Sequence, residues 1–265
     1  MAVAGFFTMS DPFSHLIILI PLLIAGTTAS MSSSVFNNLY DMDIDLKMRR
    51  VSTRRTEISD HKKRYAALMV LLLLISIVVS ILFLNVVSMV FILAGFASYA
   101  FLYTMILKRR TEWNIVIGGI AGSFPALAGS SAVYGFPSIA SIFVAVMVFL
   151  WTPTHFWALA IKYREDYMEA GIPMLPATSG LPAARRAIFV NSLILIVFMA
   201  LPVYFIWMEN GLLFRIFAIP LGLLLFIPSM VYYLKESTEK EYRKLFSYSN
   251  SFLTIALILV VASTF

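Results

Sequence analysis

Residues 65–84 read YAALMVLLLLISIVVSILFL, a run of twenty residues without a charged side chain. An α-helix of about 20 apolar residues crosses a bilayer core of about 30 Å. This run is therefore predicted to span a membrane as one helix. The whole chain shares its character, since 60% of its 265 residues are hydrophobic and only 13% are charged, with a mean hydropathy of +0.88. Soluble domains carry about 25% charged residues, so the composition excludes a protein that is surrounded by water.

Similar apolar runs recur along the chain, and they predict eight spanning helices. The predicted spans are residues 13–36, 65–84, 88–107, 113–134, 138–161, 188–207, 212–234 and 245–265. The short alternating segments typical of a β-barrel are absent from the sequence. There is also no cysteine, which excludes disulfides, zinc thiolate sites and thiol catalysis. The expected fold class is an all-α, polytopic membrane helical bundle, with residues 1–265 forming a single transmembrane domain.

The basic residues lie in alternate loops. Nineteen of the twenty Lys and Arg residues fall within residues 37–64, 108–112, 162–187 and 235–244, and only Arg215 lies elsewhere. By the positive-inside rule these loops are cytoplasmic and both termini lie on the other side of the membrane. The sequence therefore predicts a multi-pass protein of the cell membrane. Because topology accounts for the net charge of +6, no nucleic acid partner is expected.

The first of two acidic segments follows the first predicted span. Asn37, Asp41 and Asp45 are four residues apart and form one stripe on a helix, with Asp43 on another side. Carboxylate and amide oxygens suit Mg²⁺, which is usually held by one or two carboxylates together with substrate phosphates. The alternative is a solvated helix end whose aspartates pair with nearby cations. The cations that follow, which are candidates to clamp phosphate oxygens, are Lys47, Arg49, Arg50, Arg54 and Arg55.

The second acidic segment reads WTPTHFWALAIKYREDYMEAGIPMLP and covers residues 151–176. Asp166 is the candidate ligand for a second Mg²⁺, so that two ions would share one diphosphate. An ordinary helix salt bridge with Lys162 is the alternative. His155 lies within a predicted span, near its cytoplasmic end, and shares a helix face with Trp151, which makes it a functional candidate. A neutral histidine that donates to a backbone carbonyl is the alternative for this residue.

A basic segment, KRRT at residues 108–111, ends another predicted span on the same side. Lys108 and Arg109 are candidates to contact a diphosphate, and membrane topology alone is the alternative explanation. The glycine-rich stretch 118–122 predicts close packing between helices. Pro153, in the following span, is expected to kink or loosen its helix.

Three blocks of sequence resemble the UbiA-type intramembrane prenyltransferases, and more narrowly the protoheme IX farnesyltransferases (heme O synthases) within that family. The blocks are NNLYDMDIDLKMRR (37–50), YTMILKRRTEWNIVIGG (103–119), and THFWALAI with EDYMEAGIPMLP (154–176). They occur in the family's order, and the likeness covers the whole chain. The resemblance implies a bundle of helices around a cavity that cytoplasmic loops cap and that binds a Mg²⁺–prenyl diphosphate.

The resemblance also implies roles for individual residues. The family's metal and diphosphate positions are matched by Asn37, Asp41, Asp45 and Asp166, of which the three aspartates are the expected catalytic residues. Its basic positions, expected to contact the diphosphate, are matched by Arg50, Arg54, Lys108 and Arg109. Candidate residues of the heme or acceptor pocket are His155, Trp151 and Tyr167. The implied reaction joins farnesyl diphosphate, water and heme b to give heme O and diphosphate for terminal oxidase assembly.

The chain departs from the family in two places. The family usually has nine spans, and most of its first span has no counterpart here, so a shortened form or a misassigned start is expected. Val51 and Arg55 replace a threonine and often a proline of the first motif, which changes the expected shape of that loop.

Two other functions are weighed against this one. The nearest is a UbiA-type prenyltransferase that acts on a quinone precursor or a lipid. A transporter or channel comes from another class, but the four spans from residue 65 to residue 161 contain no Asp, Glu, Lys or Arg, which argues against ion coupling. The expected partners are the lipid bilayer, farnesyl diphosphate and heme b, with heme A synthase or terminal oxidase assembly components as further candidates.

Overall fold

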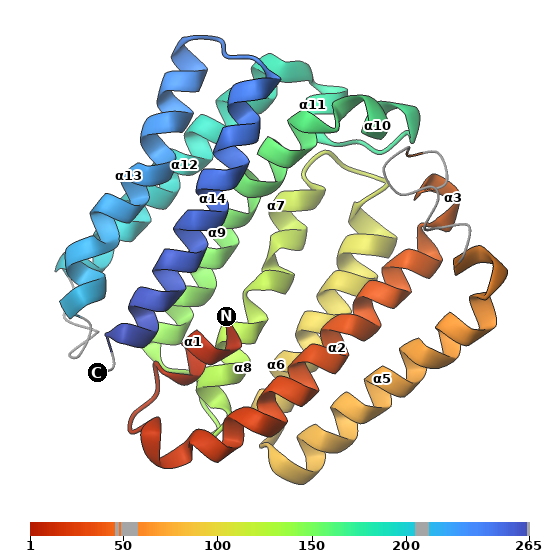
Figure 1. The fold of residues 1–265 in the computed structure, drawn as a ribbon, viewed down its shortest axis with the longest axis vertical. Helices are drawn as coiled ribbons and strands as arrows, with labels where there is room; N and C mark the ends of the chain where they lie inside the picture. The colour runs from red at the N-terminus through yellow and green to blue at the C-terminus, as the bar shows by residue number, and fades with distance from the viewer. Residues whose placement is uncertain (46–47, 49–57, 205–211, 264–265) are drawn as a thin grey trace.

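The computed structural model describes residues 1–45, 48, 58–204 and 212–263, which form helices and turns with no strand (Figure 1). The long helical elements are α2 (Leu19–Tyr40, preceded by η1, Phe13–Ile18), α5 (Lys62–Phe83), α6 (Val86–Ala97, continued by η2, Ser98–Leu107), α9 (Ile139–Lys162), α12 (Gly180–Tyr204), α13 (Leu212–Leu234) and α14 (Glu239–Ala262). The short elements are α1 (Ala2–Phe6), α3 (Met42–Asp45), α7 (Asn114–Gly118), η3 (Gly119–Gly122), α8 (Phe124–Ser131), α10 (Arg164–Glu169) and α11 (Leu175–Thr178). The expected all-α class is confirmed.

Seven helices in the described part of the chain are long and apolar enough to cross a membrane, and each matches a predicted span. The remaining predicted span, 113–134, is helical but is not the single helix that we expected. It is divided into α7, the 3₁₀ turn η3 and α8. Glycine weakens helices, and Pro125 lacks the N–H needed inside one but is favoured in a first turn. The glycines before Pro125 therefore end one helix, and the proline starts the next.

Two helices begin well before their predicted spans, by eight and six residues. α12 begins at Gly180 rather than at residue 188, and α14 begins at Glu239 rather than at residue 245. The parts of both helices that precede the predicted spans carry charged side chains, such as Arg185 in α12 and Lys240 in α14. Hydropathy detects only the apolar part of a helix, so it misses polar turns that continue beyond the membrane.

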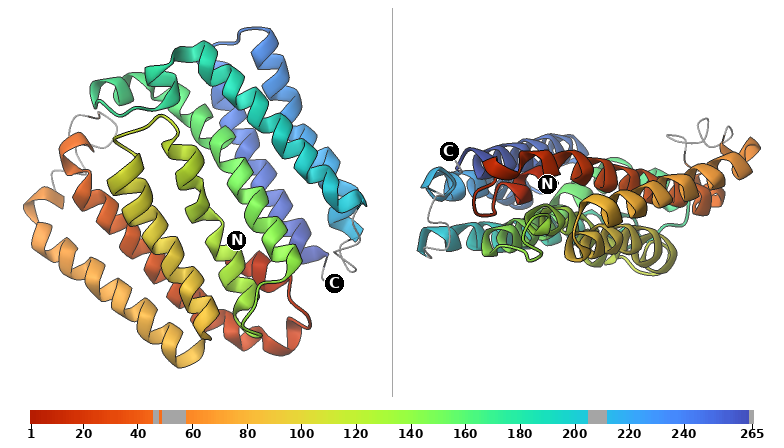
Figure 2. Two further views of the ribbon diagram at one scale, coloured as in Figure 1. Left: turned by 180° about the vertical axis from the view of Figure 1, so that it is seen from behind. Right: turned by 90° about the horizontal axis from the view of Figure 1, so that it is seen from below.

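The connections that carry the basic residues lie at one end of the bundle. Figure 1 shows the α2–α3 junction, the η2–α7 loop, α10 with α11, and the α13–α14 connection at the upper end, while both termini lie toward the opposite end. Among the described residues, the basic connections therefore share one end, as predicted. Seen from below, the helices form two layers, with α2 and α14 in one and α6 and α8 in the other (Figure 2).

α9 is the central helix of the bundle. In its most apolar window 61% of the residues are buried, against 17–28% in the other six spans, and it packs on α8, α12 and α14. Pro153 lies inside α9, which continues as one helix. The carbonyl of Leu150 accepts a hydrogen bond of 2.7 Å from the side-chain amide of Asn191 on α12. Neighbouring helices commonly satisfy backbone groups near a proline in this way.

The packing between the helices has the character of a membrane protein. Large apolar side chains such as Leu71, Ile81 and Val197 are exposed, whereas small polar ones are buried. Buried serines join neighbouring helices by donating to backbone carbonyls at 2.7–2.9 Å: Ser32 to Met69, Ser76 to Ala25, Ser88 to Ala128, and Ser123 to Ala145. Small residues and interhelical hydrogen bonds are the usual means of helix association in lipid.

Glycines permit the closest contacts. A Cβ atom on Gly5 of α1 would lie 2.0 Å from the carbonyl oxygen of Ala126, and one on Gly129 of α8 would lie 2.0 Å from that of Ala2. The predicted close packing at 118–122 is also found, because a Cβ on Gly118 would lie 2.6 Å from the ring of Tyr103. Gly118 thus leaves space for an aromatic side chain at the basic end of the bundle.

Candidate active site

The end of α2 places the first acidic segment. The amide of Asp41 donates to the carbonyl of Asn37 at 2.9 Å, and the amide of Asp45 donates to that of Asp41 at 2.9 Å. Helical hydrogen bonding thus continues from α2 into α3, and the three side chains follow one another by one turn, as predicted. All three are buried, and Asp41 is completely so at 0% exposure. A solvated helix end, the alternative from the sequence, does not describe Asp41.

The carboxylate of Asp41 is held by groups from two helical segments. Its Oδ2 accepts from Nδ2 of Asn37 at 2.6 Å and from Nζ of Lys108 at 2.5 Å. Its Oδ1 lies 3.2 Å from a guanidinium nitrogen of Arg109. A buried charge is tolerated only when it is paired and hydrogen-bonded. Lys108 and Arg109, which follow η2, therefore compensate a carboxylate 67 and 68 residues away.

Arg109 also joins Asp43, to which the sequence assigned no role. Its two terminal nitrogens donate to the two carboxylate oxygens of Asp43 at 2.7 and 2.8 Å, in the bidentate geometry of strong Arg–carboxylate pairs. The guanidinium also donates to the carbonyl of Tyr40 and lies 5.0 Å from the centre of its ring. Hydrogen bonding to Arg109 lowers the pKa of Asp43, and the same pair raises the pKa of Arg109. The side chain of Asp43 is 63% exposed, so this pair forms the rim of the site.

The segment that leads to Lys108 is a π-helix, η2. The amide of Lys108 donates to the carbonyl of Tyr103, five residues earlier, at 2.8 Å. Thr104 is completely buried on this helix; its hydroxyl donates to the carbonyl of Tyr99 at 2.9 Å and accepts from Nδ2 of Asn37 at 3.1 Å. The sequence does not point to Thr104, because no sequence signal separates a π-helix from an α-helix. π-Helical turns are rare and are frequent at functional sites.

The second acidic segment lies beside the first. Ile44 and Met48 share an apolar cluster with Tyr167 of α10 and with Ile172 and Met174 before α11. Tyr103 packs against this cluster. Asp166, which precedes Tyr167, is half-buried. The fold therefore brings the two predicted segments together through their apolar side chains.

The loops around the site are joined to one another. Glu112 accepts hydrogen bonds from the hydroxyls of Thr178 and Ser179 at 2.7 and 2.6 Å, and these bonds lower its pKa. Asn114 donates to the carbonyl of Pro173 at 3.2 Å. The η2–α7 loop is thus attached to the segment around α11.

Two predicted residues of the acceptor pocket lie together, apart from the third. The ring of His155 lies between those of Trp151 and Phe246, with ring centres 4.3 and 4.6 Å away, and its Nδ1 is 2.7 Å from the hydroxyl of Ser249. Trp151 belongs to the core cluster around α9 and α14, whereas Tyr167 belongs to the cluster beside α3. The partner of His155 is a serine hydroxyl rather than the backbone carbonyl that the alternative supposed.

Among the predicted diphosphate residues, Arg50 and Arg54 lie outside the described residues. Within the described ranges, no group of three or more His, Asp or Glu side chains is close enough to hold a metal ion by itself. The buried pair Asp41 and Asp45, with the amide of Asn37, nevertheless fits Mg²⁺, because this ion is usually held by one or two carboxylates and completed by substrate phosphates.

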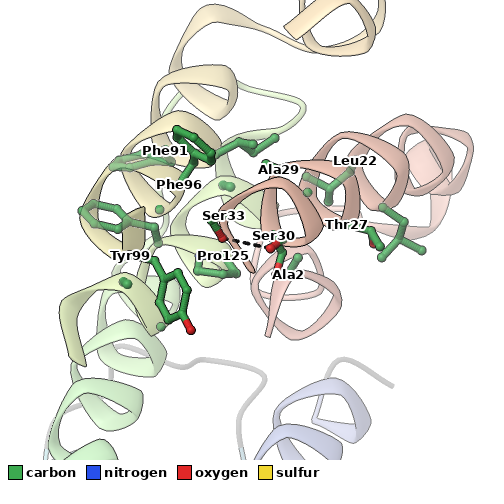
Figure 3. Close-up of a pocket in the computed structure, with 18 of the residues that line it drawn as sticks. Ala2, Leu22, Thr27, Ala29, Ser30, Ser33, Phe91, Phe96, Tyr99 and Pro125 are labelled. Atoms are coloured by element: carbon green, nitrogen blue, oxygen red, sulfur yellow. Dashed lines mark hydrogen bonds between the residues drawn. The ribbon is translucent and has the colours of Figure 1, made fainter. Parts of the chain in front are cut away.

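A cavity of about 410 Å³ lies between α2, α6 with its continuation η2, and the η3–α8 segment (Figure 3). Ser33 of α2 lines it one turn before Asn37, and Tyr99 lines it from η2. Tyr99 stacks on Tyr103 with ring centres 5.6 Å apart, so this pair connects the cavity to the acidic stripe. Most of the other lining residues are apolar or small, including Gly26, whose added Cβ would meet no atom within 4 Å.

Comparison with known proteins places these features in a family. The sequence matches the UbiA prenyltransferase family over residues 1–254. It is 43% identical to protoheme IX farnesyltransferase 2 of Picrophilus torridus over 264 residues, which cover 97% of this chain and 90% of that protein. It is 37% identical to the protoheme IX farnesyltransferase of Saccharolobus islandicus over 262 residues, covering 98% of this chain and 90% of that one.

The fold is similar to that of a UbiA homologue from Archaeoglobus fulgidus, solved bound to GPP and Mg²⁺. The TM-score is 0.67 at 14% sequence identity, with 98% of this chain and 95% of that chain covered. A structure of a UbiA homologue from the same organism, bound to DMAPP and Mg²⁺, gives a TM-score of 0.66. The predicted resemblance is thus confirmed, and the protein is a multi-pass membrane protein. The chain belongs to the UbiA prenyltransferase family.

Proposed function

We propose that this protein transfers the farnesyl group of farnesyl diphosphate to a vinyl group of heme b, with addition of water, to give heme O and diphosphate. The observation that carries the proposal is the buried Asn37–Asp41–Lys108–Arg109 cluster beside an apolar cavity, in a chain that is 43% identical to a protein named protoheme IX farnesyltransferase 2. Other acceptors and transport are not favoured, because the relatives reported above carry the heme-specific name.

The acidic stripe is the proposed site for the diphosphate. Asn37, Asp41 and Asp45, together with Asp166, would hold Mg²⁺, which supplies positive charge to the diphosphate when bound. The Archaeoglobus fulgidus homologue was solved with Mg²⁺ and a prenyl diphosphate, which supports this cofactor. Lys108 and Arg109 would contact phosphate oxygens as they release Asp41, and Arg50 and Arg54 remain proposed diphosphate residues.

The cavity is the proposed compartment for the farnesyl chain. It begins one helical turn from Asn37 and continues between α2 and α6, so a diphosphate at the stripe would direct its chain into it. Its volume of about 410 Å³ lies within the range of about 300–1,000 Å³ typical of ligand sites. Small residues such as Gly26 line it from α2, and Phe91 and Phe96 line it from α6, so much of the wall is apolar.

The reaction requires separation of charge and its stabilisation. As the bond between C1 of farnesyl and the diphosphate oxygen breaks, the electron pair stays on the diphosphate, where preorganised cations such as Lys108 and Arg109 lower the barrier. The allylic cation would be stabilised by aromatic faces, and the candidates are Tyr99, which lines the cavity, and Tyr103, which stacks on it. The vinyl group of heme b forms the new bond to C1, and water adds to the resulting cation and loses a proton.

The heme is proposed to approach from the side of α9 and α10, where His155, Trp151 and Tyr167 are the candidate contacts. The basic end of the bundle is proposed to be cytoplasmic and the membrane to be the cell membrane, by the positive-inside rule. The chain is proposed to act as a single domain. Heme A synthase or terminal oxidase assembly components are proposed as the proteins that receive heme O.

Mass spectrometry of the hemes in membranes that contain the protein tests the proposal. We expect a farnesylated heme with the wild-type protein, none with Asp41→Ala, and none when EDTA removes divalent metal. Glu239→Ala, an exposed change at the start of α14, is the matched control and keeps activity. Farnesyl transfer at the wild-type level by Asp41→Ala, inserted in equal amount, would refute the assignment of the site.

A further inference from the structure

Thr104 lies next to Asn37, the first residue of the acidic stripe. It is completely buried on η2, and its hydroxyl is in contact with Asn37 on α2. Two parallel contacts join the segments: Thr104 with Asn37, and Lys108 with Asp41 one turn later on both sides. Neither contact follows from the sequence, because the partners are 67 residues apart.

Hydrogen-bond chemistry fixes the orientation of the Asn37 amide. A carboxylate accepts hydrogen bonds and has none to give, so Asp41 can bind only the NH₂ group of Asn37. The Thr104 hydroxyl has one hydrogen, and it is donated to the carbonyl of Tyr99 at 2.9 Å. The hydroxyl is therefore left only to accept, and it too binds the NH₂ group. Both neighbours turn Nδ2 inward, which leaves the amide oxygen for another partner.

The π-helix makes this arrangement possible. In an α-helix a threonine hydroxyl reaches the carbonyl three or four residues earlier. In η2 the hydroxyl of Thr104 reaches the carbonyl five residues earlier, that of Tyr99. The backbone thus occupies the hydroxyl hydrogen and converts Thr104 into an acceptor for Asn37.

We infer that Thr104 is a positioning residue that turns the carbonyl oxygen of Asn37 toward the divalent metal of the prenyl diphosphate complex. The inference rests on the proposed function, in which Asn37 is a metal ligand. Without the hydroxyl, the amide loses one of its two inward contacts and can present NH₂, which cannot bind a cation, to the metal. Partners of this kind typically change metal affinity by about 10- to 100-fold.

The test measures Mn²⁺ binding by electron paramagnetic resonance. It uses the detergent-solubilised protein with farnesyl thiolodiphosphate, an unreactive substrate analogue. Thr104→Val keeps the shape and removes the hydroxyl, whereas Thr104→Ser keeps the hydroxyl. We expect Mn²⁺ binding to weaken about 10-fold or more in Thr104→Val and to stay within about twofold of wild type in Thr104→Ser. The unfolding temperature without metal serves as the structural control and should change little.

A double-mutant cycle identifies the route of the effect. If Thr104 acts through Asn37, Thr104→Val should weaken Mn²⁺ binding little further in an Asn37→Ala background, because coupled residues are not additive. Additive losses would overturn the inference, and so would wild-type binding by Thr104→Val. If Thr104→Val does not fold, Thr104→Ala is judged by the same readouts, and failure of both to fold would show the hydroxyl to be structural. If wild-type protein binds no Mn²⁺ with the analogue, the proposed function itself fails.

Discussion

Gly26 offers a direct test of the farnesyl compartment. It lies in the middle of α2 and lines the cavity, and a Cβ added there would meet no atom within 4 Å. Glycine is a poor helix former, so Gly26→Leu should not weaken α2. The new side chain instead extends into the cavity and occupies space with four carbons, nearly one five-carbon isoprene unit.

The magnitude follows from the apolar surface that would be lost. Farnesyl exceeds geranyl by one isoprene unit, and burial of five carbons at about 0.8 kcal/mol each gives about 4 kcal/mol as an upper bound. This corresponds to nearly a thousandfold in kcat/KM. We expect Gly26→Leu to shift the preference between the two diphosphates toward geranyl by about 100-fold, since the protein relaxes in part.

The assay compares kcat/KM for geranyl and farnesyl diphosphate with heme b in detergent, read as prenylated heme by mass spectrometry. Thr28→Leu is the matched control, because it adds a similar side chain to the same helix at a residue that does not line the cavity. Gly26→Ala should leave the preference for farnesyl over geranyl diphosphate nearly unchanged. If Gly26→Leu folds and keeps the wild-type preference for farnesyl diphosphate, the chain does not occupy this cavity and the reasoning is wrong.

Three further predictions concern the charged cluster and the packing. Lys108→Met leaves Asp41 buried without its closest cation, so we expect a loss of about 3–5 kcal/mol of stability and at least a 100-fold loss of activity. Arg110→Ala, an exposed control, should change neither stability, measured by chemical unfolding, nor activity, measured by the heme assay. The folded pKa of Asp43 is lowered, so its pair with Arg109 contributes fully to folding stability above about pH 4, and this contribution is lost as pH falls through the folded pKa. The difference in unfolding temperature between wild type and Asp43→Asn should therefore be constant from pH 5 to 8 and should disappear in stronger acid. Gly129→Ala places a Cβ within 2.0 Å of the Ala2 carbonyl oxygen and should destabilise the α1–α8 contact by about 1–3 kcal/mol. Thermal unfolding measures this loss, which should be absent in the control Gly26→Ala.

The sequence predicts the spans well because hydropathy reports a property of each segment alone. Seven predicted spans correspond to helices in the described residues, and the loops with the cations share one end. The interruption of span 113–134 was missed, because apolar composition does not reveal that glycines and Pro125 divide the helix.

The acidic stripe was predictable for the same local reason. Asn37, Asp41 and Asp45 are linked by helix periodicity, and the structure keeps them one turn apart. The partners of Asp41 were not predictable, since Lys108 and Arg109 are brought to it by the packing of η2 against α2. The role of Thr104 depends on a π-helix, a backbone choice that side-chain patterns do not encode.

The balance of charge around Asp41 has a consequence for how an anion is admitted. Asp41 and Asp43 already pair with Lys108 and Arg109, so these two cations are neutralised before any anion binds. When magnesium diphosphate binds, Lys108 and Arg109 would exchange their carboxylate partners for phosphate oxygens, while Mg²⁺ would bind the released carboxylates, as in an ion exchanger. Few charges are then desolvated without a partner during binding. The contribution of Lys108 and Arg109 to affinity should then depend only weakly on ionic strength.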